Sequence, residues 1–284
     1  MNRFTDMLRS GRVLLMDGAM GTQLQSVNRS DSATVRAVHR AYLDAGAEVL
    51  LTNTFQANPA TQEVWRAARE LARLPYARPY FVLGDVGPID NLTREIAWQI
   101  WRVNRGADGL LLETWTSFDA LAEVAHARDN SDLPLLVSFT FVRAANETVR
   151  TFDGSTPEEC ARVAKAVGAC AVGANCGKEI DLSDMVEIVR RYHDACDLPV
   201  FMRPNAGTPT QTADGWEYPR TPAPMAAELP RLLAEGIAMI GGCCGTTPEH
   251  IRSFREVVDV SNRNQSQFSR GPLARVPDAR GEVN

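Results

Sequence analysis

The sequence of 284 residues lacks any long apolar run and any long block of one charge. No stretch approaches the roughly 18 uninterrupted apolar residues of a membrane-spanning helix, which argues against a membrane protein. The net charge is −5 and there is no basic stripe, so the sequence predicts no nucleic-acid partner. Residues 1–20 carry charges throughout and have no apolar core of signal-peptide length, which favours a cytoplasmic protein.

Cysteine and histidine are scarce, with six and four residues respectively. In a reducing cytoplasm, clustered cysteines bind metal or do chemistry more often than they form disulfides. The histidines are interpreted as surface or packing residues, because all four fall in segments with helical spacing: His39, His126, His193 and His250. None of them follows an apolar run together with a cysteine.

The dominant pattern is an alternation of short apolar runs and helical segments. Eight apolar runs occur, at residues 12–18, 47–53, 79–85, 108–114, 133–139, 169–175, 198–204 and 237–243. Their length and composition are typical of strands buried on both faces of a parallel sheet. The alternation predicts a single-domain α/β protein, a (β/α)8 TIM barrel over residues 1–260. A doubly wound open sheet is the alternative.

Helix starts are also marked in the sequence. In "STPEEC", Thr156 is expected to cap a helix, with Pro157 in its first turn and Glu159 completing a capping box. The segment "TTPEHI" at 246–251 has the same features. Residues 261–284 lose periodicity and are interpreted as a mobile polar tail.

Three cysteines are expected at the ends of two barrel strands. Cys176 follows the sixth apolar run, and Cys243 and Cys244 follow the eighth. Catalytic groups of a barrel lie at the C-terminal ends of its strands, so these thiols can converge. Three thiolates with one open position are typical of a catalytic zinc site. The nearby glycines, Gly241, Gly242 and Gly245, would let the backbone bend so that both adjacent sulfurs face one ion.

Other interpretations of the cysteines stay open at this point. Buried cysteine is common as a small hydrophobic residue, which is the interpretation of Cys160, Cys170 and Cys196. The adjacent pair could form a strained disulfide, and the protein would then be a redox protein. The acids Asp17 and Glu113 at strand ends could be capping or salt-bridge residues, and Asn205 an ordinary turn residue.

Taken in order, the strand-end motifs resemble the homocysteine S-methyltransferase family. The motifs are "DGAMGT", "TNTFQAN", "VGP", "ET" at 113–114, "GANC", "PNAG" and "GGCCGTTPEHI", and the resemblance covers about residues 12–258. "RPNAG" is most similar to the homocysteine-binding module of cobalamin-dependent methionine synthase. The resemblance implies a TIM barrel that transfers a methyl group to homocysteine and forms methionine.

The resemblance also implies roles for individual residues. Zn²⁺ would be held by the catalytic residues Cys176, Cys243 and Cys244, with Asn205 as a fourth ligand that the homocysteine sulfur displaces. The remaining implied substrate contacts are Asp17 and Glu113 to the amino group, and the backbone of Gly18, Ala19, Met20 and Gly21. Zinc would stabilise the acceptor thiolate, which otherwise forms sparingly because a free thiol has a pKa of about 8.5.

The segments expected to cover the barrel mouth are shorter here than in typical family members. They lie between "DGAMGT" and the next helix, around 60–79, and between "VGP" and the fourth apolar run. The expected partners are homocysteine and a small-molecule methyl donor. One alternative is a homocysteine- and zinc-binding component that works with a cobalamin-binding protein, and another is a methyltransferase for a different small thiol or selenol.

Overall fold

A computed structural model describes residues 2–24, 31–128, 131–144, 148–177, 179–213 and 215–268. Its main sheet has eight parallel strands in the order β1, β12, β9, β8, β5, β4, β3, β2. Their bounds are β1 Leu14–Leu15, β2 Val49–Leu51, β3 Phe81–Val86, β4 Gly109–Leu112, β5 Leu135–Phe139, β8 Ala171–Asn175, β9 Val200–Arg203 and β12 Met239–Ile240. Each of the eight predicted strands is present.

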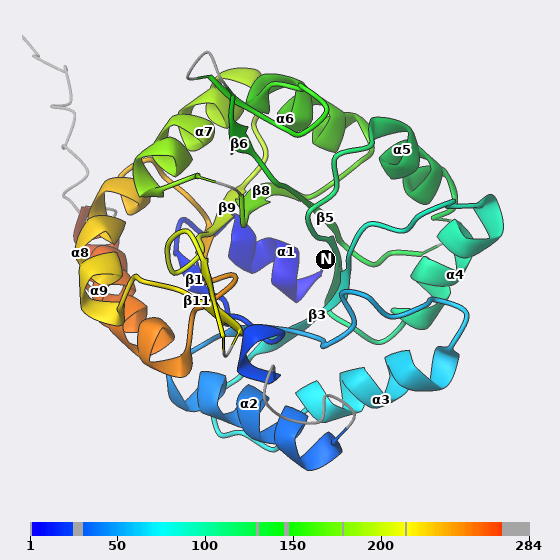
Figure 1. Ribbon diagram of the computed structural model, residues 1–284, viewed down its shortest axis with the longest axis horizontal. Helices are drawn as coiled ribbons and strands as arrows, with labels where there is room; N and C mark the ends of the chain where they lie inside the picture. The colour runs from blue at the N-terminus through cyan, green and yellow to red at the C-terminus, as the bar shows by residue number, and fades with distance from the viewer. Residues whose placement is uncertain are drawn as a thin grey trace, which may run out of the picture.

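The sheet closes on itself between its first and last strands. Met16 and Val49 form a parallel bridge there, and the Asp17 N–H donates to the Val49 carbonyl at 2.8 Å. Helices surround the closed sheet as a ring, as Figure 1 shows. The architecture is therefore the predicted (β/α)8 barrel and not an open sheet.

The ring consists of α2 Ser32–Asp44, α3 Gln62–Ala72, α4 Arg94–Val103, α5 Phe118–His126, α6 Pro157–Ala166, α7 Leu182–Ala195, α8 Pro222–Leu233 and α9 Pro248–Phe268. A further helix, α1 Arg3–Leu8, lies inside the ring in Figure 1. Its Phe4 packs on Phe81 at the start of β3, with ring centroids 5.1 Å apart, so α1 covers the N-terminal end of the barrel. Over the described ranges, no helix has the length and hydropathy needed to cross a bilayer.

Both predicted helix starts are present. The α6 capping box forms as expected, with the Thr156 hydroxyl accepting from the Glu159 N–H at 3.2 Å and the Glu159 carboxylate accepting from the Thr156 N–H at 2.8 Å. At the start of α9, His250 has the role that Glu159 has at α6. The Thr247 N–H donates to His250 Nδ1 at 3.1 Å. His250 is thus a capping residue.

The C-terminal helix is longer than the sequence predicts. The polar tail was expected from residue 261, but α9 continues to Phe268. Asn262 helps to anchor this extension, because its side chain pairs with both the N–H and the carbonyl of Val13, at 2.8 and 3.0 Å. The rest of the expected tail, residues 269–284, lies outside the described residues.

Two short hairpins were not predicted. One consists of β6 Val142–Arg143 and β7 Val149–Arg150, and the other of β10 Thr210–Thr212 and β11 Gly215–Glu217. Each follows the C-terminal end of a barrel strand. In Figure 1 the β10–β11 hairpin projects over the barrel opening.

The barrel interior changes from apolar to polar toward the C-terminal ends of the strands. Inward-facing positions alternate along each strand, and the lower ones are apolar, as at Leu83, Leu111 and Phe201. Further along β3, β5, β8 and β9, and just past the end of β4, the inward residues are charged or polar. They are Asp85, Glu113, Ser138, Asn175 and Arg203, and all are buried. This polar layer forms the floor of the site.

Candidate functional site

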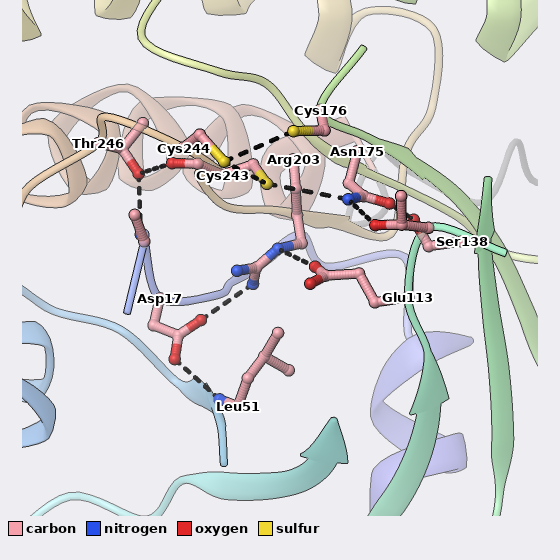
Figure 2. Close-up of polar contacts among 12 residues, drawn as sticks. Asp17, Leu51, Glu113, Ser138, Asn175, Cys176, Arg203, Cys243, Cys244 and Thr246 are labelled. Carbon is pink, nitrogen blue, oxygen red and sulfur yellow. Dashed lines mark hydrogen bonds and ion pairs between the residues drawn. The ribbon is translucent and has the colours of Figure 1, made fainter. Parts of the chain in front are cut away.

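The three predicted cysteines meet at the C-terminal mouth of the barrel. Cys176 Sγ lies 3.5 Å from Cys244 Sγ, and Cys243 Sγ lies 4.0 Å from Cys244 Sγ. All three sulfurs are within 4.8 Å of one another, a spacing that one metal ion can bridge. Figure 2 shows the three side chains converging from two chain segments. The geometry therefore favours a metal site over isolated buried thiols.

The local backbone explains how adjacent cysteines face one point. Cys176 has a φ of 57° and Gly245 a φ of 79°, so the chain turns through left-handed conformations at both segments. Gly241 and Gly242 have no such φ and serve a different purpose from the predicted bending. A Cβ at Gly241 would lie 2.7 Å from the Asp17 carbonyl, so glycine is needed there for close approach.

The thiols of the cluster resist ionisation without a cation. The hydrogen bond from Cys243 lowers the pKa of Cys176, but contact with Cys244 and burial outweigh it and raise this pKa to about 12. The contact with Cys176 and burial raise the pKa of Cys243 well above its ordinary value. Three thiolates at this spacing need a positive charge, so the donor set fits a thiophilic cation such as zinc.

Asn205 lies beside this cluster, as expected. Its amide N–H donates to the Gly177 carbonyl at 3.5 Å, and a side-chain hydrogen bond links it to Cys176. Its buried Oδ1 has no hydrogen-bond partner among the described residues. An unpaired buried oxygen next to three sulfurs fits a fourth metal ligand.

Asn175 orients Cys243, a contact that the sequence analysis missed. Its Nδ2 donates to Thr114 Oγ1 at 2.8 Å and reaches Cys243 Sγ at 3.8 Å. Its Oδ1 accepts from the Ser138 hydroxyl. Figure 2 shows this side chain lying between the thiols and β5. Outer hydrogen bonds of this kind fix the orientation of metal ligands.

Tyr218 contacts the other side of the thiol cluster. Its side chain forms a hydrogen bond with Cys244. The contact with Cys176 and, to a smaller extent, this bond lower the pKa of Cys244, but Cys243 and burial outweigh them and raise it to about 12. A Cβ at Gly245 would overlap the Tyr218 ring, so glycine is required at that position. Tyr218 follows β11, which assigns the unpredicted hairpin a role in enclosing the site.

The two predicted acids are joined by an arginine. Arg203 Nη1 lies 2.9 Å from Asp17 Oδ1, and Arg203 Nε lies 3.3 Å from Glu113 Oε1 (Figure 2). All three side chains are buried. Burial raises the pKa of Asp17 although Arg203 opposes this, and the same two effects act on Glu113.

Arg203 and Asp85 are charged residues of the site that the sequence analysis did not single out. Asp85 is buried, and burial together with the negative charge of Glu113 raises its pKa well above the ordinary value. The sequence contains a pattern that could have identified both residues. Both residues occur at inward positions of apolar runs, two residues after Leu83 and Phe201. A buried charge at such a position is costly unless it is paired, which indicates a functional or ion-paired residue.

The "DGAMGT" loop is held against the cysteine loop by Thr246. The Thr246 hydroxyl accepts from the Ala19 N–H at 3.1 Å and donates to the Cys243 carbonyl at 2.7 Å. The Ala19 carbonyl in turn accepts from the Tyr42 hydroxyl at 2.6 Å. The two backbone groups of Ala19 are therefore engaged within the protein, whereas a Cβ at Gly21 would meet open space.

A cleft of about 510 Å³ opens beside Asn205. Its wall comes from three segments, which are the start of α7 with the residues before it, the loop after β9, and the residues after β11. Asp181 and Glu179 line one side, and Pro219 and Arg220 line the other. A small molecule in this cleft would approach the cysteine cluster from the Asn205 side.

The remaining cysteines are packing residues, as predicted. Cys160 and Cys196 belong to the core between the sheet and the helices, and Cys170 packs against the barrel interior. All six cysteines are free thiols in the structure.

Comparison with known proteins gives a family match. The sequence model of the family described as homocysteine S-methyltransferase matches residues 14–258. The chain is 30% identical over 325 aligned positions to the methionine synthase of Mycobacterium tuberculosis (strain ATCC 25618 / H37Rv). The alignment covers 94% of this chain and 26% of that protein, so the chain spans about a quarter of its length.

Two solved structures of the homocysteine methyltransferase MmuM from Escherichia coli are similar to the barrel. The apo form has a TM-score of 0.67 at 26% identity, covering 86% of this chain and 95% of that one. The metallated form has a TM-score of 0.67 at 25% identity, covering 88% of this chain and 98% of that one.

Proposed function

The chain belongs to the homocysteine S-methyltransferase family, and we propose that it methylates the thiol of homocysteine to form methionine, using zinc held by Cys176, Cys243 and Cys244. The observation that carries this proposal is the convergence of the three sulfurs within 4.8 Å at the barrel mouth. Catalytic zinc sites use three protein ligands and keep one position for substrate.

Residues around the three cysteines would orient the metal ligands and occupy the open position until the substrate binds. Zinc, when bound, would lower the pKa of the acceptor thiol and favour its thiolate. Asn205, whose Oδ1 lacks a hydrogen-bond partner among the described residues, is the proposed fourth ligand in the absence of substrate. Asn175 and Tyr218 hold Cys243 and Cys244 by hydrogen bonds.

The acceptor would lie between the thiol cluster and the buried acids. Glu113 and Asp17 are the proposed partners of its ammonium group, and the backbone from Gly18 to Gly21 borders the same space. Asp17 is held in place by its ion pair with Arg203. The acceptor thiol releases its proton to solvent, and its sulfur attacks the methyl carbon. The new S–C bond forms as the bond to the donor breaks, and that electron pair leaves with the donor.

The methyl donor would enter through the cleft beside Asn205. Glu179 and Asp181 line this cleft, and Arg220 on its other side is paired with Glu228. The remaining negative charge favours a donor that carries its methyl group on a positively charged sulfur or nitrogen. Loss of that positive charge during transfer makes the methyl carbon reactive.

Methionine formation from homocysteine by the reduced, zinc-loaded chain tests the proposal. S-methylmethionine, S-adenosylmethionine, betaine, methylcobalamin and methylfolate are offered in parallel. We expect turnover with one donor and none for Cys243→Ser, which also loses zinc on dialysis. The matched control is Cys170→Ser, which removes a partly buried thiol away from the cluster and should keep both zinc and turnover.

The outcomes separate the possibilities. Full activity of Cys243→Ser without bound metal would remove zinc from the proposal. Retained zinc with no methionine from any donor would remove homocysteine as the acceptor.

A second function is favoured by the relatives. Because the chain matches about a quarter of a methionine synthase, it could act as the homocysteine-binding part of a cobalamin-dependent system. Turnover with methylcobalamin alone, increased by an added cobalamin-binding protein, would support this function over a self-sufficient enzyme.

A further inference from the structure

The chain after β4 carries one extra residue where it leaves the barrel. The Leu110 N–H donates to the Pro134 carbonyl at 2.8 Å, and the Trp115 N–H donates to the Ser138 carbonyl at 3.0 Å. The acceptors, 134 and 138, are four positions apart, whereas the donors, 110 and 115, are five apart. In a regular sheet, groups that face the same neighbouring strand recur at every second residue, so this segment contains a β-bulge.

Thr114 lies in this bulge with a left-handed backbone conformation. Its φ is 67°, while the Glu113 N–H before it still donates to the Val86 carbonyl of β3 at 2.9 Å. A β-branched residue rarely adopts such a φ, because its side chain crowds the backbone. Strain of this kind persists at functional sites when surrounding contacts hold it. The contacts of the Thr114 side chain therefore indicate why threonine occupies the bulge.

The hydroxyl of Thr114 holds the side chain of Asn175. Asn175 Nδ2 donates to Thr114 Oγ1 at 2.8 Å and also reaches Cys243 Sγ at 3.8 Å, while Asn175 Oδ1 accepts from the Ser138 hydroxyl. An amide nitrogen has two N–H groups, so one is used by Thr114 and the other by the sulfur. Asn175 is 1% exposed, so water cannot replace these partners.

The Asn175 amide affects Cys243 in two ways. An N–H that donates to sulfur favours the thiolate form, which is the form that binds metal. The same contact fixes the direction in which the sulfur points, as outer hydrogen bonds do for other metal ligands. Without the Thr114 hydroxyl, the amide would be held on one side only, by Ser138, and could turn its N–H away from the sulfur.

We propose that Thr114 is a positioning residue for the metal centre, because its strained bulge aims the hydroxyl at Asn175 and so keeps the Asn175 N–H on the Cys243 sulfur. The bulge thereby connects the acidic end of β4 to the thiol cluster. This inference rests on the zinc-binding part of the proposed function and is independent of the methyl acceptor and donor.

The zinc affinity of the reduced chain tests the inference, measured by competition with a chromophoric chelator. Thr114→Val keeps the branched shape and loses the hydroxyl, whereas Thr114→Gly loses the hydroxyl and relieves the strain. Each should raise the Kd for zinc about 10- to 100-fold, the typical effect of losing an outer contact. Thr114→Ser keeps the hydroxyl and should bind zinc as wild type does. Wild-type affinity in Thr114→Val and Thr114→Gly would overturn the inference.

Urea unfolding of the zinc-free chain separates positioning from folding. Thr114→Gly should unfold at a higher urea midpoint than Thr114→Val, because glycine adopts a left-handed φ without strain. The two variants should nevertheless bind zinc equally weakly. Zinc affinities that follow the urea midpoints across the variants would assign Thr114 to the fold alone and overturn the inference.

A double variant tests whether Thr114 acts through Asn175. Asn175→Ala removes the donor to the sulfur, so Thr114→Val in that background should raise the Kd for zinc no further. Additive losses would show that Thr114 acts by another route and would overturn the inference. Should Asn175→Ala fail to fold, Asn175→Ser provides the same comparison with a small polar side chain.

The wild-type result separates this inference from the proposed function. A reduced wild-type chain that binds no zinc would overturn the zinc-dependent function together with the inference. Tight zinc binding by wild type and by Thr114→Val alike would overturn the inference alone.

Discussion

At the scale of single residues, the site depends on side chains that hold other side chains. Asn175 donates toward Cys243 and accepts from Ser138, while Thr246 joins the Cys243 carbonyl to Ala19. None of these three polar residues carries a charge, so they orient the thiol cluster without adding to its negative potential. Uncharged donors near sulfur favour its thiolate form.

Asp85 is expected to reduce the stability of the ligand-free protein. It is an acid whose folded-state pKa lies well above its ordinary value of 3.8, because of burial and the charge of Glu113. Below pH 3.8 both states are protonated. As the pH rises through 3.8, the unfolded chain ionises before the folded one, so the free energy of unfolding falls until the folded pKa is reached.

Asp85→Asn should therefore raise the free energy of unfolding at pH 7, because the variant has no buried carboxyl group that resists ionisation there. Urea unfolding of the ligand-free chain at pH 5 and pH 7 measures this, and the difference from wild type should grow with pH. A variant that is less stable at pH 7 would show that the attraction between Asp85 and Arg203 outweighs the burial of the charge.

At the scale of elements, the site is built by loops that rigid strands and helices hold. The cysteine loop between β12 and α9 is fixed at its far end by the α9 cap, where His250 accepts from the Thr247 N–H and contacts the Arg220 carbonyl at 2.9 Å. The Arg220 contact joins α9 to the segment that carries Tyr218. Both sides of the thiol cluster are thereby tied to one helix start.

Thr246→Val should loosen the contact between the "DGAMGT" loop and the cysteine loop. Valine keeps the shape of threonine but loses the hydroxyl, so the buried Ala19 N–H loses its partner. We expect a loss of about 1 to 3 kcal/mol in the free energy of unfolding. Urea denaturation measures it, with Thr210→Val in the exposed β10–β11 hairpin as the control. A loss no larger than that of the control would mean that the two loops are held by backbone contacts alone.

At the scale of the whole molecule, metal binding should be coupled to folding. The three cysteines come from segments after β8 and β12, far apart in the sequence, so the unfolded chain does not present them together. A ligand that binds only the folded state stabilises it by mass action. Zinc binding then stabilises the whole barrel, including its closure between β1 and β2, because a single cooperative domain unfolds as a unit.

Zinc should therefore raise the melting temperature of the reduced chain. At free zinc about 100-fold above its Kd, the expected gain is about 2.7 kcal/mol, or about 4 to 5 °C for a domain of this size. Differential scanning calorimetry with and without a chelator measures the shift. Cys170→Ser should show the full shift and Cys243→Ser little of it. An equal shift in both variants would place the metal outside the cysteine cluster.

The sequence by itself determined the architecture and the place of the thiols. Eight apolar runs alternating with helical segments leave few ways to bury both faces of a parallel sheet, so the barrel and its strand ends follow from local patterns. Once the strand ends were known, Cys176, Cys243 and Cys244 had to lie at one mouth. Family resemblance then supplied the substrate that the residues alone could not identify.

Only the tertiary structure decided which charges face one another. Arg203 and Asp85 belong to runs whose periodicity indicates strands, but their partners lie on other strands, 186 positions away in the case of Arg203 and Asp17. The acceptor positions that Asp17 keeps for a ligand depend on that contact and on the Leu51 N–H, neither of which leaves a local pattern in the sequence. Electrostatic interactions act through space, and only the closed barrel brings these side chains together.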